Sequence, residues 1–110
     1  MRAIRFEQTG GPEVLTVADV PKPEPKAGEI LVKHQAIGVN FIDTYHRSGL
    51  YPVRLPSGLG MEAAGVVEAV GEGVTRFAPG DLVAYASGPI GAYAEYAATP
   101  AERAVRLPAG

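Results

Sequence analysis

The sequence has 110 residues, enough for one domain with a single modest hydrophobic core. It contains no cysteine, which excludes disulfide scaffolds, thiolate nucleophiles and cysteine-ligated zinc. A formal net charge of -2 with interspersed signs argues against nucleic-acid binding, and no apolar run is long enough to span a bilayer.

The segments between the frequent Gly and Pro residues are short and rich in Val, Ile, Leu and Tyr, which predicts a mainly β domain. Two strands are predicted first, over Arg2 to Phe6 and Val14 to Val20, and a proline-stiffened loop follows. A longer strand is predicted over residues 29–39, with Ile30, Val32, His34 and Ala36 facing one side. Later strands are predicted in segments 65–71, 77–86, 91–100 and 103–108. Their regular spacing favours a barrel or a sandwich.

One polar segment interrupts the strands and predicts a short helix over Phe41 to Ser48. Asn40 is a suitable N-cap, and Asp43 stands at the third helical position, where its carboxylate can reach back to free amides. Gly49 suits a left-handed cap at the C-terminal end. Because Tyr45 shares a helix face with the first residue of the helix, we expect it to point toward other protein groups.

Metal, nucleotide and hydrolase sites receive little support from the remaining motifs. His34 and His46 fall in different elements without close ligand spacing, so we predict no metal site with Asp43 or Glu62. We expect His46 to be exposed on its helix and His34 to be half-buried in its strand. The glycines of segment 88–93 lack the G-x-G-x-x-G spacing and predict a loop or hairpin. The serines have no nucleophile-elbow context.

The chain carries, in this order, the motifs "GGPEVL", "KAGEILVKHQAIGVN", "GLGMEAAGVVEAVGEGVTRFAPGDLVAY" and "GAYAEYA". They resemble the N-terminal GroES-like domain of the medium-chain dehydrogenase/reductase superfamily. Within it, "GVNFIDTYHRSGLYP" resembles the quinone oxidoreductase (zeta-crystallin-like) family. The resemblance implies a GroES-like, partly open β-barrel with a short helix over residues 1–110. It also implies a Rossmann NADPH-binding domain, which these residues do not contain.

The resemblance further implies hydride transfer from NADPH to a quinone without zinc. Zinc-dependent alcohol dehydrogenases have a cysteine where this chain has Asn40 and a histidine where it has Met61. A quinone accepts a hydride readily because reduction creates an aromatic ring, so hydrogen-bond donors can replace a metal. The donors implied at the acceptor oxygen are Asn40, Tyr45 and Tyr51. The residues implied at the nicotinamide half of NADPH are Phe41, Ile42, Asp43, Thr44 and Tyr45, although Asp43 has the competing role of capping its helix.

Two alternatives stay open at this level. A zinc-free 2-alkenal or enoyl reductase of the same superfamily would use the same cleft on an activated double bond. A non-catalytic GroES-like binding module is the alternative from another class, and the polar helix segment argues against it. The chain start shows no signal-peptide hydrophobic region, so we expect a cytoplasmic protein. The expected partner is a quinone or conjugated carbonyl, with no nucleic acid or membrane, in a full-length homodimer.

Overall fold

A computed structural model of the chain describes residues 1–108, which contain seven strands, one α-helix and two short 3-10 helices. The strands are β1 (Arg2–Arg5), β2 (Thr16–Asp19), β3 (Glu29–Ile37), β4 (Ala63–Val70), β5 (Leu82–Tyr85), β6 (Tyr96–Pro100) and β7 (Ala104–Arg106). The helices are η1 (Pro12–Val14), α1 (Phe41–Ser48) and η2 (Ala101–Arg103).

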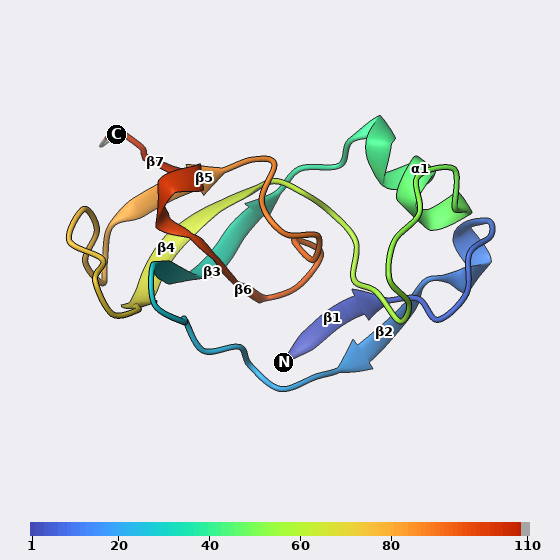
Figure 1. Ribbon diagram of the computed structural model, residues 1–110, viewed down its shortest axis with the longest axis horizontal. Helices are drawn as coiled ribbons and strands as arrows, with labels where there is room; N and C mark the ends of the chain where they lie inside the picture. The colour runs from blue at the N-terminus through green and yellow to red at the C-terminus, as the bar shows by residue number, and fades with distance from the viewer. Residues whose placement is uncertain (109–110) are drawn as a thin grey trace.

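All strand pairs are antiparallel. β1 and β2 form a hairpin, and the other strands form a five-stranded sheet in the order β6-β3-β4-β5-β7. Figure 1 shows this sheet curled into a half-barrel, with the hairpin and α1 toward the opposite end of the molecule. An isolated bridge pairs Ala3 of β1 with Ala94, in the loop that leads into β6, and so links the hairpin to this loop of the five-stranded sheet. The predicted mainly β, partly open barrel with one short helix is therefore confirmed.

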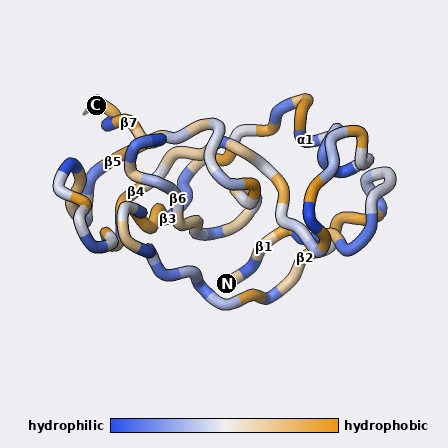
Figure 2. The backbone as a smooth tube through the Cα atoms, in the orientation of Figure 1, coloured by the Kyte–Doolittle hydropathy of each residue, from blue (hydrophilic) through white to orange (hydrophobic). Residues whose placement is uncertain are grey.

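The core is built mainly on the strands of the five-stranded sheet. Its largest fully buried members come from neighbouring strands and include Ile30, Val32, Val67 and Val83. Burial of such side chains stabilises the fold by roughly 1.5–3 kcal/mol each. In Figure 2 hydrophobic stretches follow the strands, whereas the turn that joins β4 to β5 at the far left is mostly hydrophilic. In β4 the buried residues Ala63, Gly65 and Val67 alternate, so one face of that strand is buried, whereas in β3 the three consecutive residues 30–32 are all buried.

The first hairpin differs from the sequence prediction at its second strand. β2 begins at Thr16 rather than Val14, because Pro12–Val14 forms a 3-10 turn. The amides of Val14 and Leu15 donate to the carbonyls of Gly11 and Pro12, both at 3.1 Å, so these two amides do not pair with a strand partner. The predicted strand start was therefore two residues early.

Other strand boundaries also differ from the prediction. β3 ends at Ile37, although the Gly38 amide still donates to the Glu62 carbonyl at 3.1 Å, and Ala36 is exposed. β4 runs over Ala63–Val70, so Gly65 lies inside it rather than at its limit. The segment 91–95 is a loop that bonds to residues 59–60, and β6 starts only at Tyr96.

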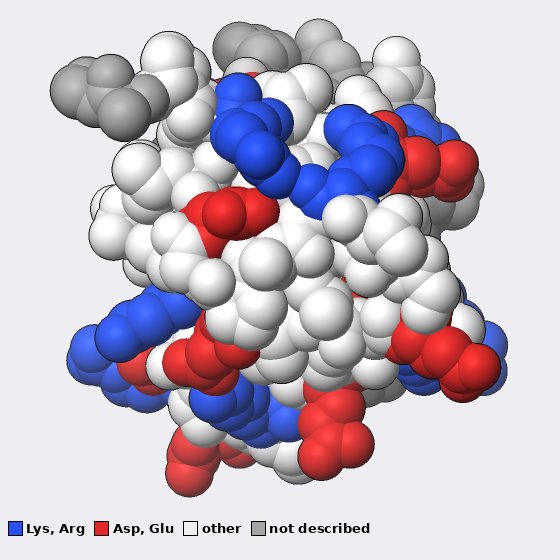
Figure 3. Space-filling model, turned by 90° about the vertical axis from the view of Figure 1, so that its left-hand side faces the viewer, with Lys and Arg blue, Asp and Glu red and all other residues white. Residues whose placement is uncertain are grey.

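Charged side chains of both signs are interspersed on the end of the molecule that Figure 3 shows, with no extended patch of one sign. This view faces the end opposite α1 in Figure 1. Within residues 1–108, no helix has the length and apolar character that crossing a membrane requires.

Candidate functional site

The N-terminus of α1 is fixed by the predicted capping arrangement. Asn40 precedes the helix with an extended backbone, and its amide donates to Oδ2 of Asp43 at 3.0 Å. Gly49 ends the helix with a φ of 87°, a left-handed conformation that glycine adopts without strain. The predicted bounds of α1 are confirmed at both ends, because the signals that set them are local.

Asp43 is a buried residue in the first turn of α1, and its carboxylate has a second hydrogen-bond partner that the sequence does not predict. Its side chain is 3% exposed, and the hydroxyl of Tyr93 donates to the same Oδ2 atom at 2.6 Å. Burial and the adjacent Asp43 carboxylate raise the pKa of Tyr93 above its ordinary value of 10.0, so the phenol keeps its proton. Of the two roles considered for Asp43, the structure supports helix capping.

Three aromatic side chains form a cluster on and beside α1, which we call the aromatic cluster: Phe41, Tyr45 and Tyr51. The ring of Tyr45 meets Phe41 at 5.4 Å and Tyr51 at 5.2 Å between centroids, both edge to face. The amide of Tyr51 donates to the Tyr45 carbonyl at 3.2 Å, which holds the third ring in place. Tyr45 therefore faces protein groups, as predicted.

The aromatic cluster and its neighbours expose several large apolar side chains to solvent. Phe41 is 75% exposed and Tyr51 is 49% exposed, and Leu50 and Val39 nearby are also exposed. Exposed aromatic faces that lie together mark binding surfaces more often than isolated exposed side chains do. The arrangement suits a flat ligand that stacks on rings and accepts hydrogen bonds from phenol hydroxyls.

The prediction that His46 is exposed is wrong. His46 is 7% exposed, and its ring lies 6.3 Å from that of Tyr51. It follows Asp43 by three residues, so both side chains occupy the helix face that packs against the domain. The buried imidazole of His46 therefore lies next to Tyr51, one of the three residues of the aromatic cluster.

Arg47 joins the last turn of α1 to the loop that carries the "GGPEVL" motif. Its Nε donates to the Gly10 carbonyl at 3.1 Å, and the Gly10 amide donates to the Arg47 carbonyl at 3.0 Å. This reciprocal pair holds the loop against the helix. No pattern in the sequence predicts this pair, because its partners lie in separate elements.

The remaining predicted residues are placed around the same helix. Asn40 is half-buried at the N-cap, and Ile42 is partly buried. The hydroxyl of Thr44 donates to the Phe41 carbonyl at 2.7 Å, so it is engaged within the helix. The structure therefore brings Asn40, Tyr45 and Phe41 together at one end of the domain, with Thr44 turned to the helix backbone.

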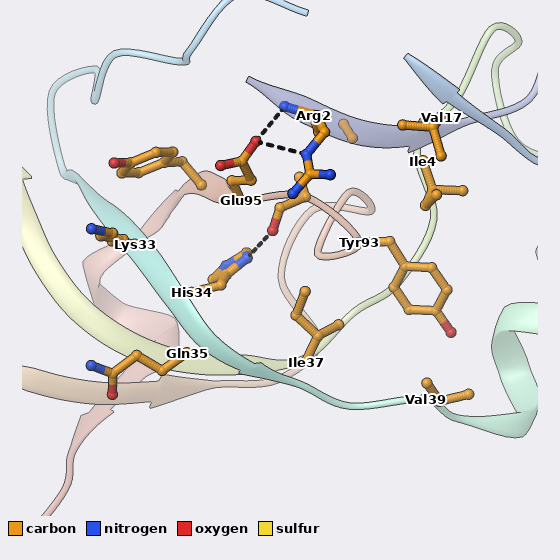
Figure 4. A pocket seen from close by; sticks show the side chains of 13 residues that line it. Arg2, Ile4, Val17, Lys33, His34, Gln35, Ile37, Val39, Tyr93 and Glu95 are labelled. Atoms are coloured by element: carbon orange, nitrogen blue, oxygen red, sulfur yellow. Dashed lines mark hydrogen bonds and ion pairs between the residues drawn. The ribbon is translucent and has the colours of Figure 1, made fainter. Parts of the chain in front are cut away.

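A groove of about 610 Å³ lies between the β1–β2 hairpin and β3. Figure 4 shows Tyr93 and Val39 at its α1 end, and Arg2 and Glu95 joined at the other. None of the residues predicted to carry catalysis lines it within the described chain. The groove and the aromatic cluster are thus separate features, which share no lining residue.

The described residues 1–108 hold no group of three or more His, Asp or Glu side chains that is placed to bind a metal ion. His34 is half-buried, as predicted, and both of its ring nitrogens are occupied by protein groups. Neither histidine of the chain lies with acidic side chains in a ligand-like arrangement within this range.

Comparison with known proteins identifies close relatives. The chain is 57% identical over 110 residues to a quinone oxidoreductase of Pseudomonas aeruginosa, covering 99% of this chain and 34% of the relative. It is 42% identical over 107 residues to a 2-haloacrylate reductase of a Burkholderia species, covering 94% and 32%. The crystal structure of the Escherichia coli quinone oxidoreductase complexed with NADPH superposes with a TM-score of 0.97 at 50% identity, covering 98% and 33%.

These relatives bear out the resemblance to quinone oxidoreductases that the motifs predict. The chain spans about a third of the length of the relatives it matches. A family model described as the alcohol dehydrogenase GroES-like domain matches residues 26–109, most of the chain. The chain therefore belongs to the alcohol dehydrogenase GroES-like domain family.

Proposed function

We propose that this chain forms the substrate-side domain of a zinc-independent NADPH:quinone oxidoreductase. The observation that carries the proposal is the exposed aromatic cluster, which stands beside a half-buried asparagine at a rigid helix N-terminus. The similarity to a quinone oxidoreductase complexed with NADPH supports the same reading.

The residues at α1 fit a nicotinamide and a quinone. Both ligands are planar, and the partly exposed rings of Phe41 and Tyr51 offer faces and edges for stacking. Tyr45 is braced between these two rings, so its hydroxyl has a defined position. NADPH, when bound, supplies a hydride to the acceptor.

The chain's own residues orient the acceptor and stabilise the charge that develops on it. In this proposal the side-chain amide of Asn40 and the hydroxyls of Tyr45 and Tyr51 donate hydrogen bonds to the quinone oxygens. As the hydride adds, negative charge accumulates on oxygen, and fixed donors stabilise it without rearranging. The added hydride and one proton from water then balance the two-electron reduction to a hydroquinone.

Independence from zinc is part of the proposal and is supported by the residue types present. Asn40 and Met61 occupy the positions where the zinc-dependent relatives have a cysteine and a histidine, and the sequence has no cysteine. An amide and a thioether are poor zinc ligands compared with thiolate and imidazole.

The deciding experiment uses the full-length protein. We expect NADPH fluorescence to change on titration, and NADPH oxidation to depend on added quinone. Prior dialysis against EDTA should leave that rate unchanged, because no metal takes part. If NADPH failed to bind, the enzyme reading would be wrong and a non-catalytic binding module would replace it; a rate abolished by EDTA would refute zinc independence alone.

A second candidate, reduction of an activated double bond, is favoured by the similarity to a 2-haloacrylate reductase. The same donors would then bind the carbonyl or carboxylate of a conjugated substrate. Parallel kcat/KM measurements with a quinone and an enone separate the two, since a preference of tenfold or more corresponds to about 1.4 kcal/mol of differential binding.

A cytoplasmic location and a homodimer belong to the same proposal. Cell fractionation tests the first, and light scattering on the full-length protein tests the second. A membrane-bound pool or a monomeric mass would contradict the respective statement.

A further inference from the structure

We propose that Tyr93 is a positioning residue that holds the N-terminus of α1, and with it Asn40 and Tyr45, through its hydrogen bond to Asp43. For its effect on catalysis the inference rests on the proposed function. For its effect on α1 it rests only on the contacts of Tyr93, which lies 50 residues from Asp43 in the chain.

One carboxylate oxygen connects two segments of the domain, the N-terminus of α1 and the loop that carries Tyr93. Oδ2 of Asp43 accepts from the Tyr93 hydroxyl at 2.6 Å and from the Asn40 amide at 3.0 Å. The oxygen is shielded from water, because Asp43 is 3% exposed. Hydrogen bonds to an ionised group are stronger than neutral ones, and a low local dielectric strengthens them further.

Tyr93 is itself held on the scaffold from both sides of its backbone. Its amide donates to the Leu59 carbonyl at 2.8 Å, and its carbonyl accepts from the Ile4 amide at 2.8 Å. The ring packs against Gly60, where a Cβ would overlap it and where φ is 96°. Tyr93 therefore transmits the position of β1 and the 57–60 loop to the helix.

The local cap alone does not define where α1 stands relative to the sheet. The bond between Asp43 and the Asn40 amide lies within the helix terminus and would move with it. The bond from Tyr93 ties the side chain of Asp43, and with it this terminus, to a loop 50 residues away in the chain. A site that must orient two ligands needs such support, since misplacement by about 1 Å already lowers rates strongly.

The test compares Tyr93→Phe with Tyr96→Phe in the full-length protein. The control, Tyr96→Phe, removes a hydroxyl from β6. The ring of Tyr96 lies against the Lys22 ammonium group, away from the contacts of Asp43. Without ligand, we expect amide hydrogen exchange in residues 40–46 to become about tenfold faster in Tyr93→Phe and to stay unchanged in the control. The NADPH dissociation constant should rise several-fold in the first variant only.

A double-mutant cycle with Asp43→Asn shows whether Tyr93 acts through Asp43. We expect Tyr93→Phe to change exchange and NADPH affinity little in the Asp43→Asn background, because the charged acceptor is already gone. Unchanged exchange at residues 40–46 in Tyr93→Phe, or strictly additive effects, would overturn the inference. Failure of the wild-type protein to bind NADPH would instead refute the proposed function, and the ligand-free exchange would still decide the role of Tyr93.

Discussion

The Nε2 atom of His34 lies 2.8 Å from the hydroxyl oxygen of Tyr85, a hydrogen bond that joins β3 to β5 across β4. On the other side of the ring, Nδ1 lies 2.8 Å from the Ala94 carbonyl. A carbonyl only accepts, so Nδ1 carries the proton and Nε2 of the neutral ring accepts from Tyr85. Burial lowers the pKa of His34 and raises that of Tyr85, which favours this neutral pair.

The stability of the domain should depend on pH through His34. Its pKa is lowered below 6.5 in the folded domain, chiefly by burial, so the unfolded chain binds the proton more readily. Stability contributed by the neutral ring is complete above about pH 6.5 and is lost as the pH falls toward the folded pKa. Urea midpoints measured from pH 8 to pH 5 should fall more steeply in the wild type than in His34→Gln. Parallel curves for the two proteins would contradict this.

Replacing the hydroxyl partner should destabilise the domain at neutral pH. Tyr85→Phe leaves Nε2 of His34 as a partly buried acceptor without its donor, which costs about 1–2 kcal/mol. The ring contact, at 5.8 Å between centroids, is retained. Tyr96→Phe is the matched control, and we expect it to stay within about 0.5 kcal/mol of the wild type. Equal denaturant midpoints for both variants would show that the His34 bond contributes nothing.

The sequence predicted α1 closely because its limits are encoded locally. Asn40, Asp43 and Gly49 act within a few residues of the helix ends, so their residue types are sufficient. The existence of the strands was also predictable from short β-rich runs between turns. Their limits were not, since contacts with distant segments decide them. Residues 91–95, for example, bond to residues 59–60 and do not extend β6, which starts at Tyr96.

The candidate site was predicted only in part, because some of its contacts are local in the sequence and others join distant segments. The contact between Phe41 and Tyr45 follows from helical spacing, whereas burial of His46 depends on which helix face meets the domain. Tyr93 lay in a segment that reads as a glycine-rich loop, and its partner is 50 residues away. Periodicity describes one element at a time, so it cannot reveal such a pair.

Substitutions in the aromatic cluster should separate donor from stacking roles in the full-length protein. Tyr45→Phe keeps the ring between Phe41 and Tyr51 but removes the hydroxyl. We expect kcat/KM for quinone to fall about tenfold, because one hydrogen bond to the acceptor is lost. Tyr51→Phe should have a smaller effect, because this ring is more exposed to water. Steady-state kinetics with one quinone measure both.

The matched control for these variants is Tyr96→Phe, which lies on β6 away from the cluster. It should leave kcat/KM unchanged. If Tyr45→Phe retained full activity while Tyr45→Ala lost it, the ring alone would matter, and the assignment of Tyr45 as a hydrogen-bond donor would be wrong.

Gly65 should tolerate no side chain, because β3 approaches β4 closely there. A Cβ at Gly65 would overlap the backbone carbonyl of Lys33 in β3. The register between β3 and β4 shifts nearby, between His34 and Ala36 of β3. Backbone atoms cannot turn aside as a flexible side chain can, so Gly65→Ala must separate the two strands. We expect it to lower the free energy of unfolding by about 3 kcal/mol, the upper part of the usual range for overpacking.

Gly73→Ala distinguishes this steric effect from the general conformational cost of replacing glycine. Among the described residues no atom lies within 4 Å of a Cβ at Gly73, but its φ of 83° is left-handed. Only the backbone strain remains there, about 1–2 kcal/mol. Urea denaturation of both variants should therefore place Gly65→Ala well below Gly73→Ala in stability. The reverse order would mean that β3 and β4 separate easily at this point, and that their close approach does not hold His34 against Tyr85.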